Sequence, residues 1–290
     1  MTIPQQSVGL ASWAALRQVQ ALRDSLAGIL NGDLYFEAKD GQLRHLDRES
    51  LPEFLTLQGF GDNGEKFATS IQQELGPQIN VVGAAIQHLR DQRLGKDWVN
   101  AAERGQRTTS GSDDFGVQRS GGGWYRTINF CITSALVRLL GAWEQFELDV
   151  LKCLFYYRPS GKPFGPPVEQ ITAQAEESVI REEPKRNDDR LVYEKPAIWT
   201  WVRKHAENNI ERRKILVAVF GIDTTPGATK DERTKSNKYR DDLYQKRHDI
   251  AHGRANVDMT LKEYVEADVF VYRCIDHLAQ QGEERQKLLV

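Results

Sequence analysis

One long apolar stripe constrains the fold of this chain more than any other feature. Between residues 128 and 156, apolar side chains recur at steps of three and four, namely Ile132, Leu136, Leu139, Leu140, Trp143, Phe146, Val150, Leu151 and Leu154. This spacing places them on one face of a single α-helix roughly 40 Å long. Because an apolar face of that length has to be covered by other helices, the sequence predicts a mainly α-helical protein.

Further helices are predicted after this one. They cover residues at about 168–180, 196–206, 210–220 and 234–252, and a last helix begins at Thr260. Glu263 follows Thr260 by three residues, which is the spacing of a capping box, in which each side chain accepts the other residue's free backbone N–H. The sequence therefore predicts a helical bundle of four or five helices over residues 124–282.

The first hundred residues form a smaller and more varied region. Helices are predicted at about 10–30, 51–57, 65–75 and 79–93. A small β-hairpin is predicted around Asp40-Gly41, because both turn residues of a tight hairpin must accept positive φ. Residues 104–123 are poor in apolar side chains and rich in Gly and Ser, which favours a linker. We therefore expect an N-terminal region, 1–103, separated by this linker from the bundle; the residues do not indicate its role.

The composition is that of a soluble globular protein, with 40% hydrophobic and 28% charged residues and a net charge of −2. A near-neutral chain is not expected to coat nucleic acid. However, residues 200–254 hold 13 Lys or Arg against 8 acids, net +5, which leaves −7 for the rest. Three cysteines without a Cys-x-x-Cys pair, and no signal or spanning segment, predict a cytoplasmic protein with reduced thiols and no membrane association.

The basic segment contains one sequence whose residue types suit catalysis, at the end of a predicted helix. It is Arg247-His248-Asp249-Ile250-Ala251-His252-Gly253. An Arg followed by a polar residue, with a His five positions after the Arg and then Gly, resembles the R-x4-H motif of the HEPN superfamily. The long preceding helix and the capped following helix agree with that resemblance, which covers roughly residues 124–282. The polar position is most often Asn in the family, and here it is His248.

The resemblance implies a metal-independent endoribonuclease without a cofactor, of a kind that commonly serves as a toxin or antiviral effector acting on tRNA or mRNA. The residues suit the chemistry, because RNA carries its own nucleophile in the 2′-OH and needs only proton transfer and charge stabilisation. We assign His252 as general acid or base, Arg247 as the phosphate clamp and His248 as the residue that orients the clamp or the phosphate. The expected products are a 2′,3′-cyclic phosphate and a 5′-hydroxyl.

Helix geometry limits how this site is assembled. Positions 247 and 252 lie about 140° apart on a straight helix, whereas 248 and 252 are about 40° apart. Either the helix frays at Ala251, or two chains face each other across a shared cleft, as HEPN dimers do. We expect a homodimer with a composite active site, and a cognate inhibitor or sensor protein as a further partner.

Several neighbouring residues are candidates for supporting roles. Lys246, Arg240 and Tyr244 are expected to contact RNA, and Glu144 and Asp249 to support the catalytic groups.

Three other interpretations compete with the nuclease. The two histidines, four residues apart, resemble half of a zinc site, but no third His or Cys pair lies nearby in the sequence, so no metal is predicted. Arg247 could instead pair with Asp242 or Glu144 while His252 caps the helix. The domain could also be a non-catalytic helical module that binds RNA or a protein partner.

Overall fold

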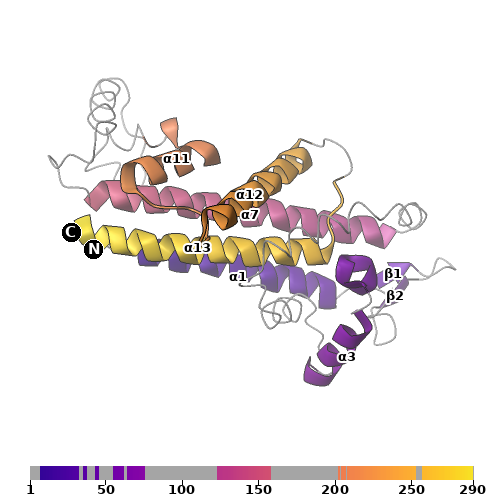
Figure 1. The fold of residues 1–290 in the computed structure, drawn as a ribbon. Coiled ribbons are helices and arrows are strands. Elements are labelled where there is room, and N and C mark those ends of the chain that lie inside the picture. The colour runs from indigo at the N-terminus through magenta and orange to yellow at the C-terminus, as the bar shows by residue number, and fades with distance from the viewer. Residues whose placement is uncertain are drawn as a thin grey trace, which may run out of the picture. The chain divides into compact units, whose positions relative to one another are not determined.

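The computed structural model describes residues 7–32, 35–37, 43–45, 55–61, 64–75, 123–157, 202, 204–206, 208–252 and 257–289. Their elements are α1 (Val8–Gly32), β1 (Tyr35–Glu37), β2 (Leu43–His45), η1 (Thr56–Phe60), α3 (Gly64–Leu75), α7 (Gly123–Tyr157), α11 (Asn209–Phe220), α12 (Lys230–Ala251) and α13 (Leu261–Leu289) (Figure 1). The predicted helices at 79–93 and 168–180, the turn at Asp40-Gly41 and residues 104–122 of the linker lie outside this part of the chain. The mainly α-helical class is confirmed.

Helices α7, α12 and α13 extend beyond the predicted bounds. Helix α7 begins at Gly123 instead of near residue 128. Helix α13 continues to Leu289, beyond the predicted bundle over residues 124–282. Helix α12 begins at Lys230, four residues before the predicted start. The reason is a capping box that the prediction missed: the Glu232 N–H donates to Thr229 Oγ1, and the Thr229 N–H donates to Glu232 Oε2, both at 3.2 Å. Its Thr-x-x-Glu spacing is the same one that located the start of α13.

The N-terminal region differs from the prediction in one helix. Strands β1 and β2 pair antiparallel, with Phe36 opposite Arg44. Of the helix predicted at 51–57, the structure describes residues 55–57, and there the chain enters the short π-helix η1, with Gly59 at φ 90°. That backbone conformation favours glycine, and it breaks a regular α-helix.

Two compact units make up the chain. Unit 1 comprises Met1–Arg17, Ala142–Pro226 and Arg273–Val290, and unit 2 comprises Gln18–Gly141 and Gly227–Tyr272. Helix α1 therefore contributes residues to both units, and the predicted division at 103 and 123 stays a prediction. Within the described residues, no helix combines the length and the hydropathy needed to cross a membrane.

Unit 1 has an apolar core to which three long helices contribute. Gly282 of α13 lies where an added Cβ would meet Val8 of α1 and Val150 of α7, so three helices approach closely there. Phe155 and Phe220 meet edge to face with centroids 5.0 Å apart. Residues 208–220 are held at both ends, by Asn208, which caps α11 through the Glu211 N–H, and by left-handed Gly221.

A half-buried histidine also belongs to unit 1. Gln281 Oε1 accepts the backbone N–H of Asp223 at 3.0 Å, which directs its amide nitrogen toward His277 Nε2, 2.6 Å away. That ring nitrogen must therefore accept a hydrogen bond, which only neutral imidazole does. Burial lowers the pKa of His277, and Arg273 acts in the same direction, while Asp223 and Asp276 oppose the shift.

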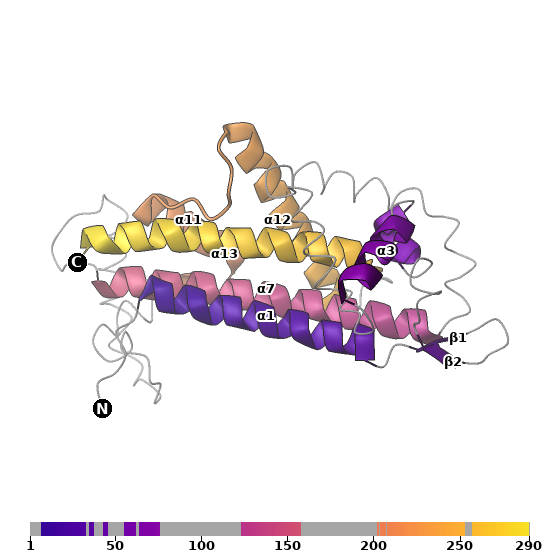
Figure 2. The same cartoon turned by 90° about the horizontal axis from the view of Figure 1, so that it is seen from below.

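Unit 2 contains a buried ion pair between helices far apart in the sequence. Arg23 of α1 lies 2.7 Å from Asp268 of α13 through Nη2 and donates to it through Nε at 2.8 Å. Asp268 is fully buried and Arg23 is 8% exposed. The guanidinium also lies 5.4 Å from the ring centroid of Tyr272. These contacts hold the second half of α1 beside the first half of α13 (Figure 2).

Helix α12 also packs in unit 2. Tyr239 meets Phe270 of α13 edge to face at 4.9 Å. Burial raises the pKa of Tyr239 well above its ordinary value, and the carboxylates of Glu266, Glu263 and Asp242 add to the shift. The phenol therefore stays neutral and serves as packing surface.

Candidate active site at the end of helix α12

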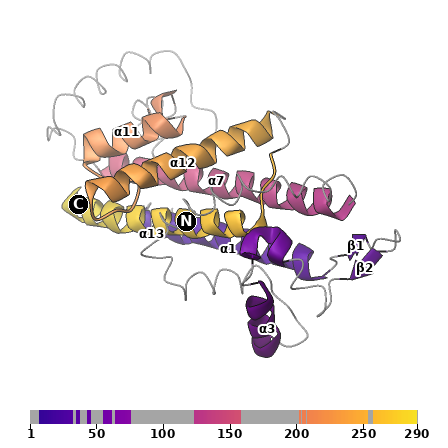
Figure 3. The ribbon, with the colours of Figure 1, turned by 45° about the vertical axis from the view of Figure 1, so that its right-hand side comes forward.

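The last turn of α12 carries the motif (Figure 3). The helix ends at Ala251, and His252 follows as its C-cap at φ −95° and ψ 4°. The His252 N–H still donates to the His248 carbonyl at 3.0 Å. Because this bond closes the final turn, the helix does not fray at Ala251, which was one of the two expected ways of assembling the site.

The two histidines of the motif lie against each other. Their ring centroids are 4.2 Å apart, and their planes are inclined by 54°. Both side chains are exposed to solvent. An intact helix explains the contact, because residues four apart lie on the same face one turn apart. The structure therefore offers two adjacent imidazoles that a ligand can reach.

The Arg247 side chain leaves α12 in a different direction from the His252 side chain. It is half-buried, and on the intact helix it lies about 140° from His252. Asp249, which was expected to play a supporting role, accepts a hydrogen bond from Gln245 Nε2 at 3.0 Å. Within one chain, Arg247 and His252 thus point to different sides of α12.

Of the three residues expected to contact RNA, Arg240 does not fit that role. It is only 1% exposed, and its guanidinium carbon lies 5.7 Å from the ring centroid of Tyr244. A side chain buried to this degree cannot reach a phosphate without a rearrangement of the helix. Tyr244 is half-buried beside it, so this pair forms a packing contact inside unit 2.

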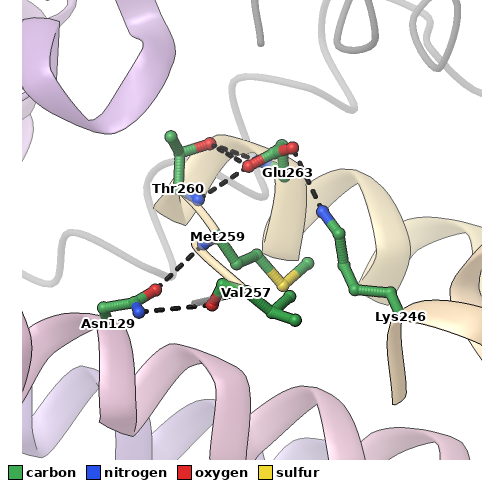
Figure 4. Close-up of polar contacts among 6 residues, drawn as sticks. All are labelled: Asn129, Lys246, Val257, Met259, Thr260 and Glu263. Carbon is green, nitrogen blue, oxygen red and sulfur yellow. Dashed lines mark hydrogen bonds and ion pairs between the residues drawn. The ribbon is translucent and has the colours of Figure 1, made fainter. Parts of the chain in front are cut away.

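Lys246 remains accessible, but an acid partly neutralises its charge. Its Nζ lies 3.3 Å from Glu263 Oε1 of α13. The other Glu263 oxygen closes the predicted capping box, accepting the Thr260 N–H at 2.7 Å while the Glu263 N–H donates to Thr260 Oγ1 at 3.2 Å. Figure 4 shows this one carboxylate joining the start of α13 to the end of α12. The predicted capping box is confirmed. The packing of α12 beside α13 gives Glu263 a second role as the partner of Lys246.

Asn129 is a further supporting residue that the sequence did not reveal. From α7 it donates through Nδ2 to the Val257 carbonyl at 3.3 Å and accepts the Met259 N–H at 2.9 Å (Figure 4). It also donates to Asp258 Oδ1 at 3.3 Å. It therefore fixes the backbone that leads into α13. A single Asn within an apolar helix carries no spacing pattern, so no sequence signal identified it.

Glu144 has a basic partner in unit 1 that the sequence did not indicate. Its carboxylate is 3.3 Å from Arg212 Nη2 in unit 1. Arg212 also approaches the fully buried Glu147 at 3.3 Å and donates to the Ala206 carbonyl at 3.0 Å. The basic partner of Glu144 that the structure shows is thus Arg212 of α11, in a cluster that stabilises the core of unit 1.

The described residues contain no group of three or more His, Cys, Asp or Glu side chains that could hold a metal ion. Cys153 and Cys274 are buried thiols, and Cys131 is partly exposed. In comparisons with known proteins, no family model, no curated protein and no solved structure matches this chain.

Proposed function

We propose that the protein is a metal-independent endoribonuclease of the HEPN type. The observation that carries the proposal is the exposed imidazole pair of His248, the residue after Arg247, and His252, five positions after Arg247. Two adjacent imidazoles supply both proton transfers that RNA cleavage requires. This gives His248, expected from the sequence to orient the clamp or the phosphate, a second role beside His252: one ring takes the proton of the 2′-OH, and the other protonates the departing 5′-oxygen. The 2′-oxygen then closes on phosphorus to form the cyclic phosphate.

Arg247 supplies the positive charge in this scheme. A guanidinium remains charged at all working pH values and presents parallel N–H donors to two phosphate oxygens. In one chain it lies on a different side of α12 from His252, so we propose that the chain works as a homodimer. Arg247 of each copy then faces the histidine pair of the partner. The RNA class, tRNA or mRNA, and a role as a toxin or antiviral effector under a cognate inhibitor belong to the same proposal.

The experiment uses purified full-length chain with total RNA in the presence of EDTA. Wild type is expected to cleave the RNA, and Arg247→Ala and His252→Ala are expected to abolish cleavage while unfolding at the wild-type urea midpoint. Lys235→Ala, an exposed substitution on the same helix, is the matched control and should retain activity. Fragments should carry 5′-hydroxyl ends, and an RNA with a single 2′-deoxy residue at the cleavage position should resist.

Intact RNA with wild type at all concentrations, or equal cleavage by wild type and both variants, would refute the nuclease. RNA binding without cleavage would instead support a non-catalytic module. Light scattering tests the assembly separately, since a monomer at the concentration of the assay contradicts the shared site.

A further inference from the structure

The histidine pair has a second chemical capability that does not depend on RNA. Two imidazoles one helical turn apart can ligate the same metal ion, because each ring has a lone pair when neutral. In this structure the rings are already adjacent, with centroids 4.2 Å apart. Both are exposed, so an ion can enter without displacing the core.

The ring geometry fits bidentate coordination. An ion with metal–nitrogen distances of about 2.0–2.1 Å and bond angles near 90–110° needs its two nitrogens roughly 3 Å apart. Each ring nitrogen lies about 1 Å from its own centroid, so centroids 4.2 Å apart allow one nitrogen of each ring to approach the other to roughly 3 Å when the two face each other. The 54° inclination also excludes a face-to-face stack, in which the lone pairs would be parallel.

The end of the helix favours a cation at this position, within a segment of the chain that is otherwise net basic. The pair occupies the C-terminal turn of a 22-residue helix, where the unsatisfied carbonyls create a negative partial charge. Lys246, one of the nearest cations in the sequence, is paired with Glu263. Asp249 adds a negative charge to the same turn. The half-buried Arg247 lies on a different side of the helix.

We propose that His248 and His252 form a binding site for one divalent transition-metal ion that prefers imidazole, such as Zn²⁺, Ni²⁺ or Cu²⁺. Two protein ligands leave the remaining coordination positions to water, so the ion exchanges freely and is not a structural or catalytic cofactor. If the chain is the proposed nuclease, the bound ion takes up the lone pairs that transfer protons and therefore inhibits cleavage. This consequence rests on the proposed function, whereas the binding itself does not.

The test measures binding without RNA. Untagged full-length chain, freed of metal by a chelator and then transferred to chelator-free buffer, is titrated by calorimetry with ZnSO₄, NiCl₂ and MgCl₂. We expect one Zn²⁺ or Ni²⁺ per chain and no saturable Mg²⁺ binding. His248→Ala and His252→Ala should each weaken Zn²⁺ binding on the order of 100-fold, because either change removes the chelate. His205→Ala is the matched control for weak binding to single histidines and should bind as wild type does.

The inference is overturned if wild type binds no Zn²⁺, if either single variant binds as wild type does, or if Mg²⁺ binds equally well. Cleavage assays with and without Zn²⁺ separate the two proposals. Zinc binding with no RNA cleavage in EDTA refutes the nuclease and supports the metal site. RNA cleavage in EDTA with no Zn²⁺ binding supports the nuclease and refutes the metal site.

Discussion

The buried ion pair between Arg23 and Asp268 tests whether α1 is an integral part of the fold. Asp268→Ala removes the carboxylate and leaves the Arg23 guanidinium, 8% exposed, without the anion that contacts it at 2.7 Å. A buried charge that loses its partner destabilises a protein by about 3–5 kcal/mol, because the ion has already given up most of its hydration. For a chain of this size, that corresponds to a fall in melting temperature of roughly 6–20 °C.

The assay is urea unfolding followed by circular dichroism, with thermal melting as a second measurement. Asp276→Ala is the matched control, since Asp276 is an exposed acid on the same helix, and it should change the free energy of unfolding by less than about 0.5 kcal/mol. The double variant Arg23→Met, Asp268→Leu should recover most of the loss, because apolar groups of similar size need no partner.

A loss below about 1 kcal/mol for Asp268→Ala would refute this reasoning, because the pair would then be hydrated or α1 would not be docked. The same argument predicts that a chain beginning at residue 124 does not fold by itself. It would lack the α1 residues Val19 and Leu26, which are buried in unit 2.

Three further predictions follow from single contacts. Asn129→Ala should cost about 1–3 kcal/mol of stability and speed hydrogen exchange of the Met259 amide, which loses its acceptor, while Gln145→Ala on the same helix should do neither. The folded-state pKa of His277 is lowered, so the unfolded chain takes up the proton first. The urea midpoint of wild type should therefore be highest above about pH 6.5 and fall as the pH drops toward the lowered pKa, and His277→Gln should flatten that fall. A parallel pH dependence in both proteins would contradict the neutral ring. Arg240→Ala should lower the free energy of unfolding by about 2 kcal/mol and leave the RNA affinity of the folded protein unchanged, whereas reduced affinity with unchanged stability would show that Arg240 contacts RNA.

The sequence by itself determined helices α1, α3, α7, α11, α12 and α13 and several of their ends. Periodic apolar positions over 128–156 predicted α7, and the spacing of Thr260 and Glu263 predicted the start of α13. Both signals are local, since they depend on hydrogen bonds and side-chain spacing within a few turns of one helix. The adjacency of His248 and His252 was predictable for the same reason, because it requires only that α12 stay intact.

Only the tertiary structure decided which helices pack together and which polar residues they bury. Arg23 and Asp268 are separated by 245 positions, and no pattern in the sequence links them. The position of Arg240 in a basic segment predicted a contact with RNA, but the packing of α12 buries its side chain. Glu144 was expected to support Arg247, and no pattern in the sequence indicated its ion pair with Arg212 of α11. A local pattern shows which face of a helix is apolar, but only the packed fold determines which long-range neighbours reach a given polar side chain.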